Sequence, residues 1–326
     1  MVNLVIGCMN AFQQPAAMVA VTLLTPRRYY TNISGMQAFS NSVNAILTPS
    51  LAAALMAFGG IRLVLAVDLI SFSVAFITLA WFIRIPEEQV EKEPGKEEES
   101  FWQQCLSGIR YLRQKRAVWN LILFFALVNL LASMAGNSLM PAMILSRTGN
   151  NQKLLGIVSS CLGVGTMAGS LVAAAARPPK SRKRAIFLSC GLSFLLCDVL
   201  WGLGQSWQVW AIAALAGNFP LPILNASLSA VLREKIPVHM QGRAFSTQAT
   251  FQFFTIPLGY LAGGVLADYV FEPFMRGDGW LQQLFVSLVG SGKGSGMAVI
   301  FLITGLAGLL INLAALKNKT FDEIDT

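Results

Sequence analysis

Apolar runs of about 20 residues recur along this chain and restrict what it can fold into. The first run is the N-terminal segment itself, where 26 residues precede the first charged side chains, Arg27 and Arg28. About 20 apolar residues form a helix long enough to cross the hydrocarbon core of a bilayer. Within a bilayer each backbone N–H and C=O needs an internal partner, so the runs predict helices. They lack the two-residue alternation of a membrane β-barrel, and the sequence therefore predicts an all-α membrane protein.

The composition supports this class. Hydrophobic residues make up 55% of the chain and charged residues 12%, and the mean hydropathy is +0.59. A soluble domain carries about 25% charged residues. The net charge of +8 is explained by the Lys and Arg that accumulate in cytoplasmic loops, so no nucleic-acid partner is expected. The lipid bilayer is the expected partner.

The apolar runs predict nine spanning helices. We place them at 2–24, 35–58, 61–83, 118–145, 154–176, 185–203, 207–232, 244–267 and 297–316. The alternate connections, counted with the tail after 316, hold 19 of the 24 Lys and Arg. Basic residues mark the cytoplasmic side, so the C-terminus is expected on the cytoplasmic side of a bacterial cell membrane. Nine crossings then place the N-terminus outside, which suggests that helices are missing upstream.

A weak internal repeat supports that expectation. At an offset of 207 residues Phe12 matches Phe219, Pro15 matches Pro222, and Gly35 matches Gly242. The first three helices then pair with the last three, which implies a unit of six helices. Two such units make twelve, so the nine helices would correspond to the fourth to the twelfth. This organisation gives four parts: the remainder of an N-terminal half (1–83), a cytoplasmic linker (84–117), a six-helix C-terminal half (118–316) and a cytoplasmic tail (317–326).

Two connections have features of their own. The linker contains a segment, 101–116, with Phe101, Cys105, Ile109 and Leu112 on one helical face and basic residues elsewhere. This pattern suits a helix on an anionic membrane surface, although a solvated linker helix remains the alternative. The long outer connection, 268–296, carries a short apolar patch from Leu284 to Val289. A surface-lying piece or a small flap is expected there.

The residues give no indication of an enzyme, a cofactor or a metal site. The five cysteines form no C-x-x-C pair and four lie in apolar runs, which is typical of reduced apolar side chains. The single histidine, His239, makes a metal centre improbable. The stretch "GSGKGSG" (290–296) lacks the strand and the Ser or Thr of a nucleotide-binding loop, and we interpret it as a flexible loop.

Several stretches resemble one transporter family. The fourth helix of this family and the loop that follows it resemble "GCMNAFQQPAAMVAVTLLTPRRY". The start of its seventh helix resembles "SGIRYLRQKRAVWNLI". The loop between its tenth and eleventh helices, together with the eleventh helix, resembles residues 232–273. The family is the major facilitator superfamily, whose fold has two halves of six helices. The bacterial exporters that include macrolide-efflux and enterobactin-exporter proteins form the subgroup that the chain resembles. The resemblance implies an exporter that moves an amphipathic small molecule by alternating access, coupled to protons, and a monomer is expected.

The sequence departs from the family at two motifs. The stretch 169–185 keeps Gly169 and a basic run but has no Asp, and the loop with the Gly- and Asp-containing motif would lie upstream of residue 1. The segment "TPSLAAALMA" keeps Pro49 but lacks the glycines of the antiporter motif. Proton antiport is therefore implied by the resemblance alone. The alternative is a truncated, transport-inactive membrane fragment that lacks the first three helices.

Polar side chains inside membrane helices are the candidates for the transport path. In the second helix they form one stripe, and the eighth helix carries amides at matching positions. Each of these amides could instead link two packed helices. The path candidates are Asn10, Gln14, Gln37, Asn41, Asn44, Thr48, Asn129, Ser133, Asn137, Asn218, Asn225, Gln248, Gln252 and Thr255.

Two acids and a few backbone-shaping residues complete the candidates. Asp68 and Asp198 lie within membrane helices, where a carboxylate is typical of a proton relay. The resemblance places both on peripheral helices, which favours a structural role. Candidates for gating or packing are Pro15, Pro222, Arg243, Gly259 and Gly263.

Overall fold

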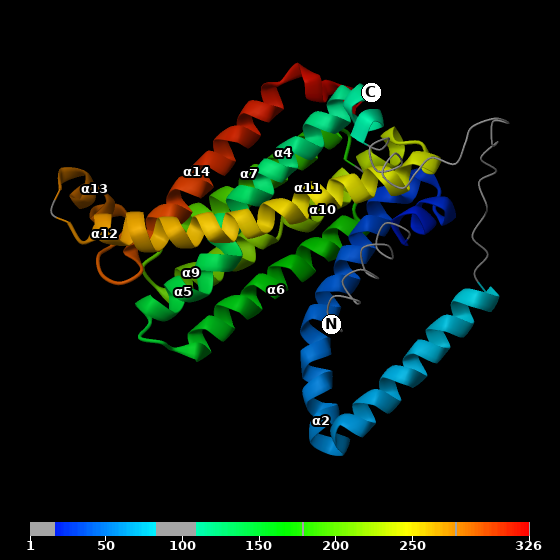
Figure 1. The fold of residues 1–326 in the computed structure, drawn as a ribbon, viewed down its shortest axis with the longest axis horizontal. Coiled ribbons are helices and arrows are strands. Elements are labelled where there is room, and N and C mark those ends of the chain that lie inside the picture. Colours follow the sequence, from blue (N-terminus) through cyan, green and yellow to red (C-terminus); the bar gives the residue numbers. More distant parts are fainter. Residues whose placement is uncertain (1–16, 83–108, 178, 278, 326) are drawn as a thin grey trace.

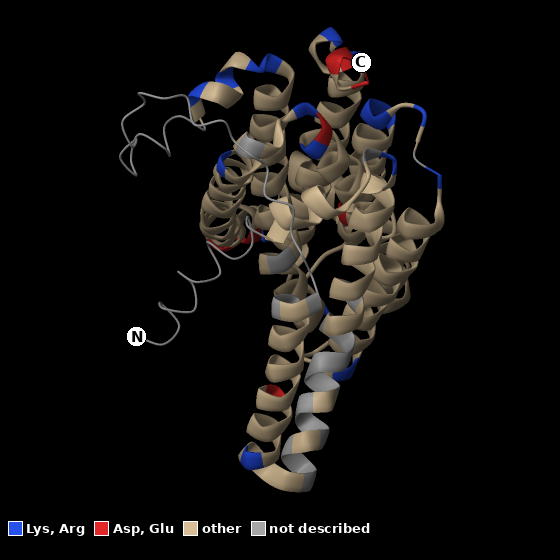
Figure 2. Cartoon of the chain, turned by 90° about the vertical axis from the view of Figure 1, so that its right-hand side faces the viewer, with Lys and Arg blue, Asp and Glu red and all other residues tan. Residues whose placement is uncertain are grey.

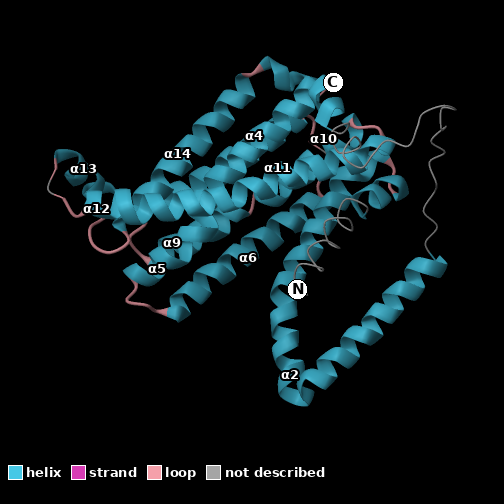
Figure 3. Ribbon diagram, viewed as in Figure 1, coloured by secondary structure: helices cyan, strands magenta, loops and turns pink. Residues whose placement is uncertain are grey.

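The structure is a computed structural model that describes residues 17–82, 109–177, 179–277 and 279–325. These residues form helices joined by short loops and contain no strand (Figures 1 and 3). Seven of the helices are long and apolar enough to cross a membrane. The predicted all-α class is confirmed for the part of the chain that the structure describes.

Many of the helices run on through short turns of another helical type, which are labelled η. The elements are η1 (Arg27–Tyr29), α2 (Tyr30–Phe82), α4 (Arg116–Ala132), η2 (Ser133–Asn137), α5 (Ser138–Arg147), α6 (Gln152–Ala175), α7 (Arg182–Phe194), η3 (Leu195–Val199), α8 (Leu200–Leu203), α9 (Trp207–Asn218), α10 (Leu221–Lys235), α11 (Val238–Val265), η4 (Leu266–Phe271), α12 (Glu272–Met275), α13 (Trp280–Val289), α14 (Ser295–Lys317) and η5 (Lys319–Ile324).

The seven apolar helices correspond to the predicted spans from 61 onward. The predicted 35–58 and 61–83 are the two parts of α2, which meet at a kink where Gly60 has a φ of 60°. Glycine adopts this φ without the steric penalty of a Cβ. The predicted first helix, 2–24, is described only from residue 17, and it is helical from there to residue 24. The count of nine and the arrangement of six plus six stay predictions.

The helices pack closely through small residues. Among the α-helices, α6 packs against α9, α14 packs against α7, and α11 packs against α4. On α6, Gly165 and Gly169 lie directly against the backbone of Leu215 and Phe219. On α11, Gly259 lies against the side chain of Ser133, and Gly263 lies against the backbone of Met134, both in η2. Packing of this kind is typical of membrane helices, because lipid leaves no hydrophobic force to bring them together.

The first part of α2 joins this bundle at one end. Near Gly35 it packs against α6 and α10, and towards Gly60 it diverges from them (Figure 1). The second part of α2, from Ile61 onward, is exposed at most of its described side chains, and Leu63 and Val64 are half-buried. Thus α2 contacts the bundle mainly at the end that carries the C-terminus.

That end of the bundle is also where most Lys and Arg gather (Figure 2). The segment η5 folds across it and buries Phe321 and Ile324 beside Phe124 and Phe187. Leu112, from the predicted surface helix 101–116, is also fully buried in this cluster. That segment is described only from residue 109, so its position on a membrane stays a prediction.

The opposite end carries the predicted outer connection. The helix α13 forms there, with Val289 buried and Trp280, Leu281 and Leu284 exposed. Arg147 at the end of α5 fixes this segment, because its guanidinium donates to the carbonyls of Val289 (2.8 Å) and Gly204 (3.3 Å). The eighth helix was predicted to end at residue 267, whereas the chain stays helical through η4 and α12 to Met275.

Candidate functional site

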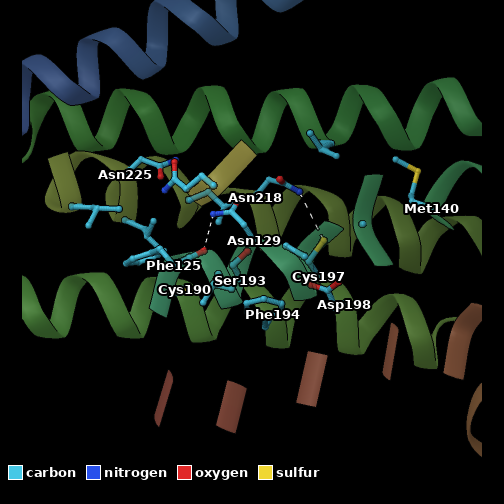
Figure 4. Close-up of a pocket in the computed structure, with 18 of the residues that line it drawn as sticks. Phe125, Asn129, Met140, Cys190, Ser193, Phe194, Cys197, Asp198, Asn218 and Asn225 are labelled. Atoms are coloured by element: carbon cyan, nitrogen blue, oxygen red, sulfur yellow. Dashed lines mark hydrogen bonds between the residues drawn. The ribbon is translucent and has the colours of Figure 1, made fainter. Parts of the chain in front are cut away.

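A cavity of about 390 Å3 lies inside the bundle, between α4, η3, α9, α10 and α11 (Figure 4). The cavity borders two clusters of buried apolar residues. One cluster contains Phe125 and Phe194, and the other contains Trp201 and Met140. All four of these side chains line the cavity. A cavity with apolar and aromatic walls and a few polar groups is the usual form of a small-molecule site.

Four amides from different helices supply most of the polar lining. They are Asn129 of α4, Asn218 of α9, Asn225 of α10 and Gln252 of α11. Two of them have fixed orientations. The side-chain nitrogen of Asn129 donates to the carbonyl of Phe125 at 2.8 Å, and that of Asn218 donates to the carbonyl of Ala214 at 2.8 Å.

The sequence left two roles open for these amides, lining a transport path or linking two packed helices, and both stay predictions. Each side-chain nitrogen bonds a carbonyl four residues earlier in its own helix, so it does not link two helices through a backbone group. The one contact to another helix is weak, from Asn218 to the sulfur of Cys197 at 3.9 Å. Each of these bonds uses one N–H, so Asn129 and Asn218 keep a carbonyl oxygen and a second N–H for a ligand. The lining therefore offers hydrogen-bond acceptors as well as donors.

A carboxylate completes this set. Asp198 is 8% exposed and lines the cavity from η3. Cys190 and Cys197 lie beside it on the same wall, seven residues apart and thus on one face of the helix. The turn η3 is a π-helix, an irregularity that often marks functional positions because it shifts the side chains that follow.

The structure thus brings together five of the residues that the sequence singled out: Asn129, Asn218, Asn225, Gln252 and Asp198. The sequence did not indicate Ser193, Phe194 or Trp201, which share the wall with Asp198. The available signal was spacing, because Cys190, Ser193, Cys197 and Trp201 follow each other at three or four residues.

The polar stripe of α2 lies elsewhere. Gln37 accepts a hydrogen bond from the guanidinium of Arg233 (3.5 Å) at the packed end of α2, and Asn41 and Asn44 are exposed. Ser133 is buried in the contact with Gly259, and Thr255 donates to the carbonyl of Gln252. Gln248 is half-buried outside the cavity lining. Asn10, Gln14 and Pro15 lie outside the described residues, as do the side chains of Thr48 and Asn137.

The remaining candidates are found in helix contacts or at the surface. Asp68 is exposed on the second part of α2. Pro222 is buried at the start of α10, and the carbonyl of Arg243 accepts a hydrogen bond from Thr247. In the described parts of the chain, no group of three or more His, Cys, Asp or Glu is placed to hold a metal ion.

The sequence profile of the major facilitator superfamily matches residues 2–260. The chain belongs to the major facilitator superfamily. The family match and the seven helices that are long and apolar enough to span a bilayer make it a multi-pass membrane protein. The cavity described above therefore lies within the membrane part of the protein.

Two bacterial relatives are similar over most of this chain. A protein of Streptococcus pyogenes named macrolide efflux protein A is 23% identical over 265 residues, which cover 80% of this chain and 64% of the relative. A protein of the same name from Enterococcus faecalis is 23% identical over 254 residues, which cover 77% and 76% of the two chains. The match thus spans about two thirds of the streptococcal relative.

Proposed function

We propose that this transporter exports an amphipathic small molecule of the macrolide type across the bacterial cytoplasmic membrane. The cavity is the observation that carries the proposal. Its amide oxygens can accept hydrogen bonds from a hydroxyl-rich solute, and its aromatic and aliphatic walls suit an apolar ring. The sequence resemblance suggests macrolides or siderophores as substrates, and the relatives named for macrolide efflux favour the first class.

Transport by alternating access requires the solute path to close on one side at a time. The contact of α2 with α6 and α10 is a candidate for the inner closure. There the side chain of Asn32 donates to the carbonyls of Ala174 (2.8 Å) and Ala176 (3.1 Å), and Gly35 lies against the same turn of α6. In this arrangement residues 1–83 belong to one moving half and 118–316 to the other, joined by 84–117. Protons are the proposed driving ion, and the protein acts as a monomer.

Basic residues give this closure its orientation. Arg177, in the connection between α6 and α7, lies next to the α2 contact, and Arg182 and Lys183, in the first turn of α7, lie beside Asp325 at the end that carries the C-terminus. Because Lys and Arg favour the cytoplasmic side, this is the inner end, and the tail 317–326 is cytoplasmic.

Export is tested in a macrolide-sensitive bacterium that expresses the chain. Cells with the protein should accumulate less radiolabelled erythromycin than cells with an empty vector, and dissipation of the proton gradient should remove the difference. The variant Asn218→Leu, which replaces a cavity acceptor by an apolar side chain, should accumulate more antibiotic than the parent. Equal accumulation with and without the chain, at matched amounts of folded protein in the membrane, would contradict the proposal and favour a transport-inactive fragment.

A further inference from the structure

Asp198 is the one carboxylate that lines the cavity among the described residues. A buried carboxylate in a membrane helix is costly unless it meets a cation or a donor. Asp198 forms no ion pair within the described residues, where the ion pairs join Arg182 to Glu234 and Lys183 to Asp322.

The helices packed against η3 place no compensating charge near Asp198. The basic residues of α7, Arg182 to Arg184, lie fourteen or more residues away, which is about 21 Å along the helix. The two long helices packed against η3 are α9 and α14. The first contains no charged residue, and the second contains only Lys317 at its last position. Asp198 lies level with Gly305, whose missing side chain lets α14 approach closely, and Lys317 is twelve residues or about 18 Å further along that helix. The other ionisable neighbours on the cavity wall are the thiols of Cys190 and Cys197.

The amides of the cavity reinforce this charge. Asn129 and Asn218 each use one N–H on a carbonyl of their own helix, and their carbonyl oxygens have no such bond within the described residues and can accept from a ligand. Oxygen acceptors, a carboxylate and the absence of a Lys or Arg in the described lining give the cavity a negative character. The rings of Phe125, Phe194 and Trp201 add π faces, which also attract cations.

We propose that Asp198 binds a protonated amine of the transported molecule and thereby selects cationic amphipathic substrates. This inference rests on the proposed function. The carboxylate accepts a charge-assisted hydrogen bond from the ammonium group, the amide oxygens bind the neighbouring hydroxyls, and the aromatic wall covers the apolar part of the ligand. Asp198 is then the group that distinguishes an amine from a neutral analogue of the same shape.

The test compares two ligands on the purified full chain in lipid nanodiscs. One is erythromycin, whose amino sugar carries a protonated dimethylamine. The other is a derivative with the same ring in which that nitrogen is an N-methyl acetamide and stays neutral. Equilibrium binding should favour erythromycin by about tenfold or more in the parent protein, as expected for a charged hydrogen bond. In the nearly isosteric Asp198→Asn the preference should disappear while the neutral ligand binds as before, and Asp198→Glu should restore part of it.

The control is Asp268→Asn, which removes an exposed carboxylate of η4 outside the cavity lining and should leave the preference unchanged. An amine preference that persists in Asp198→Asn would overturn the inference and leave the proposed function standing. A parent protein that binds both ligands equally would also overturn it. Failure of the folded parent to bind either ligand would instead contradict the proposed function, and the inference with it. Thermal unfolding of each variant shows whether it is folded. If Asp198→Asn does not fold, the amine preference is measured in Asp198→Glu instead.

Discussion

At the scale of single residues, Asp325 shows how one carboxylate can organise a basic loop. The loop 177–184 contains five Lys and Arg and no acid of its own. Asp325 accepts hydrogen bonds from the hydroxyl of Ser181 (2.6 Å) and from the backbone N–H groups of Arg182 (2.7 Å) and Lys183 (3.1 Å). These amides belong to the first turn of α7, where a helix has no internal partners for them and where its dipole favours a negative charge.

The substitution Asp325→Ala is therefore expected to destabilise the start of α7. The loss of a helix cap costs about 1 kcal/mol, and less is expected at this exposed position in high salt. Hydrogen exchange should become faster at the amides of Arg182 and Lys183, with a small decrease in the unfolding temperature in detergent. Asp268→Ala removes an exposed carboxylate of η4 and is the matched control. Unchanged exchange at both amides would show that Asp325 does not cap the helix in solution.

The residues of the cavity show what a sequence can and cannot indicate at this scale. Asn129, Asn218, Asn225 and Gln252 were recognisable because an amide in an apolar helix needs a polar surrounding. The same reasoning selected Gln37 and Asn41, which lie outside the cavity. Side-chain type identifies which residues need a partner, but the partner depends on how the helices are rotated against each other. Asp198 was expected to be structural because the resemblance placed its helix at the periphery. Its position in the cavity lining depends on how the helices around η3 pack, which has no signal in the sequence.

At the scale of elements, the contact between α2 and α6 depends on a position without a side chain. A Cβ built on Gly35 would lie 2.5 Å from the backbone nitrogen of Ala174 and 2.6 Å from the carbonyl carbon of Ala173. These are backbone atoms, which cannot rotate away as a flexible side chain does. Gly35 is thus required for the two helices to meet as closely as they do.

Gly35→Ala should consequently separate α2 from α6 and weaken the inner closure. Efflux of erythromycin is expected to fall severalfold, whereas equilibrium binding to the cavity should change little because Gly35 does not line it. The matched control is Gly156→Ala on α6, where a new Cβ would meet nothing within 4 Å. Both changes increase helix propensity by a similar amount, so a difference between them reports the contact. Equal efflux in the two variants would argue against a gating role for this contact.

The helices themselves were the most predictable elements, since hydropathy alone located the seven apolar spans from residue 61 onward. Their ends were less predictable. The eighth predicted helix was ended before Asp268, but a charged residue at the membrane surface does not stop a helix, and the chain continues to Met275. The π-helical turns η2, η3 and η4 were not predicted, because such turns arise where packing forces an extra residue into a helix and leave no periodic signal.

At the scale of the whole molecule, the two ends of the bundle differ in charge and in covering. The end with the C-terminus carries most Lys and Arg and is covered by η5 (Figure 2). The opposite end carries α13, whose Trp280 is 75% exposed. Aromatic residues on a surface-lying helix are typical of the membrane–water interface. The charge pattern along the sequence was enough to predict this polarity, whereas the covering segments depend on tertiary contacts.

This polarity leads to a prediction about topology. In a variant whose native cysteines are replaced by Ser or Ala, Lys293→Cys introduces a thiol into the exposed loop between α13 and α14, and Lys319→Cys introduces one into η5. A membrane-impermeant maleimide added to intact cells should label the first variant and not the second, because the positive-inside rule places η5 in the cytoplasm. Permeabilised cells should show labelling of both, which controls for reactivity. Labelling of Lys319→Cys alone in intact cells would mean that the chain is inserted the other way round, with its basic loops outside and the contact of α2 with α6 on the outer side.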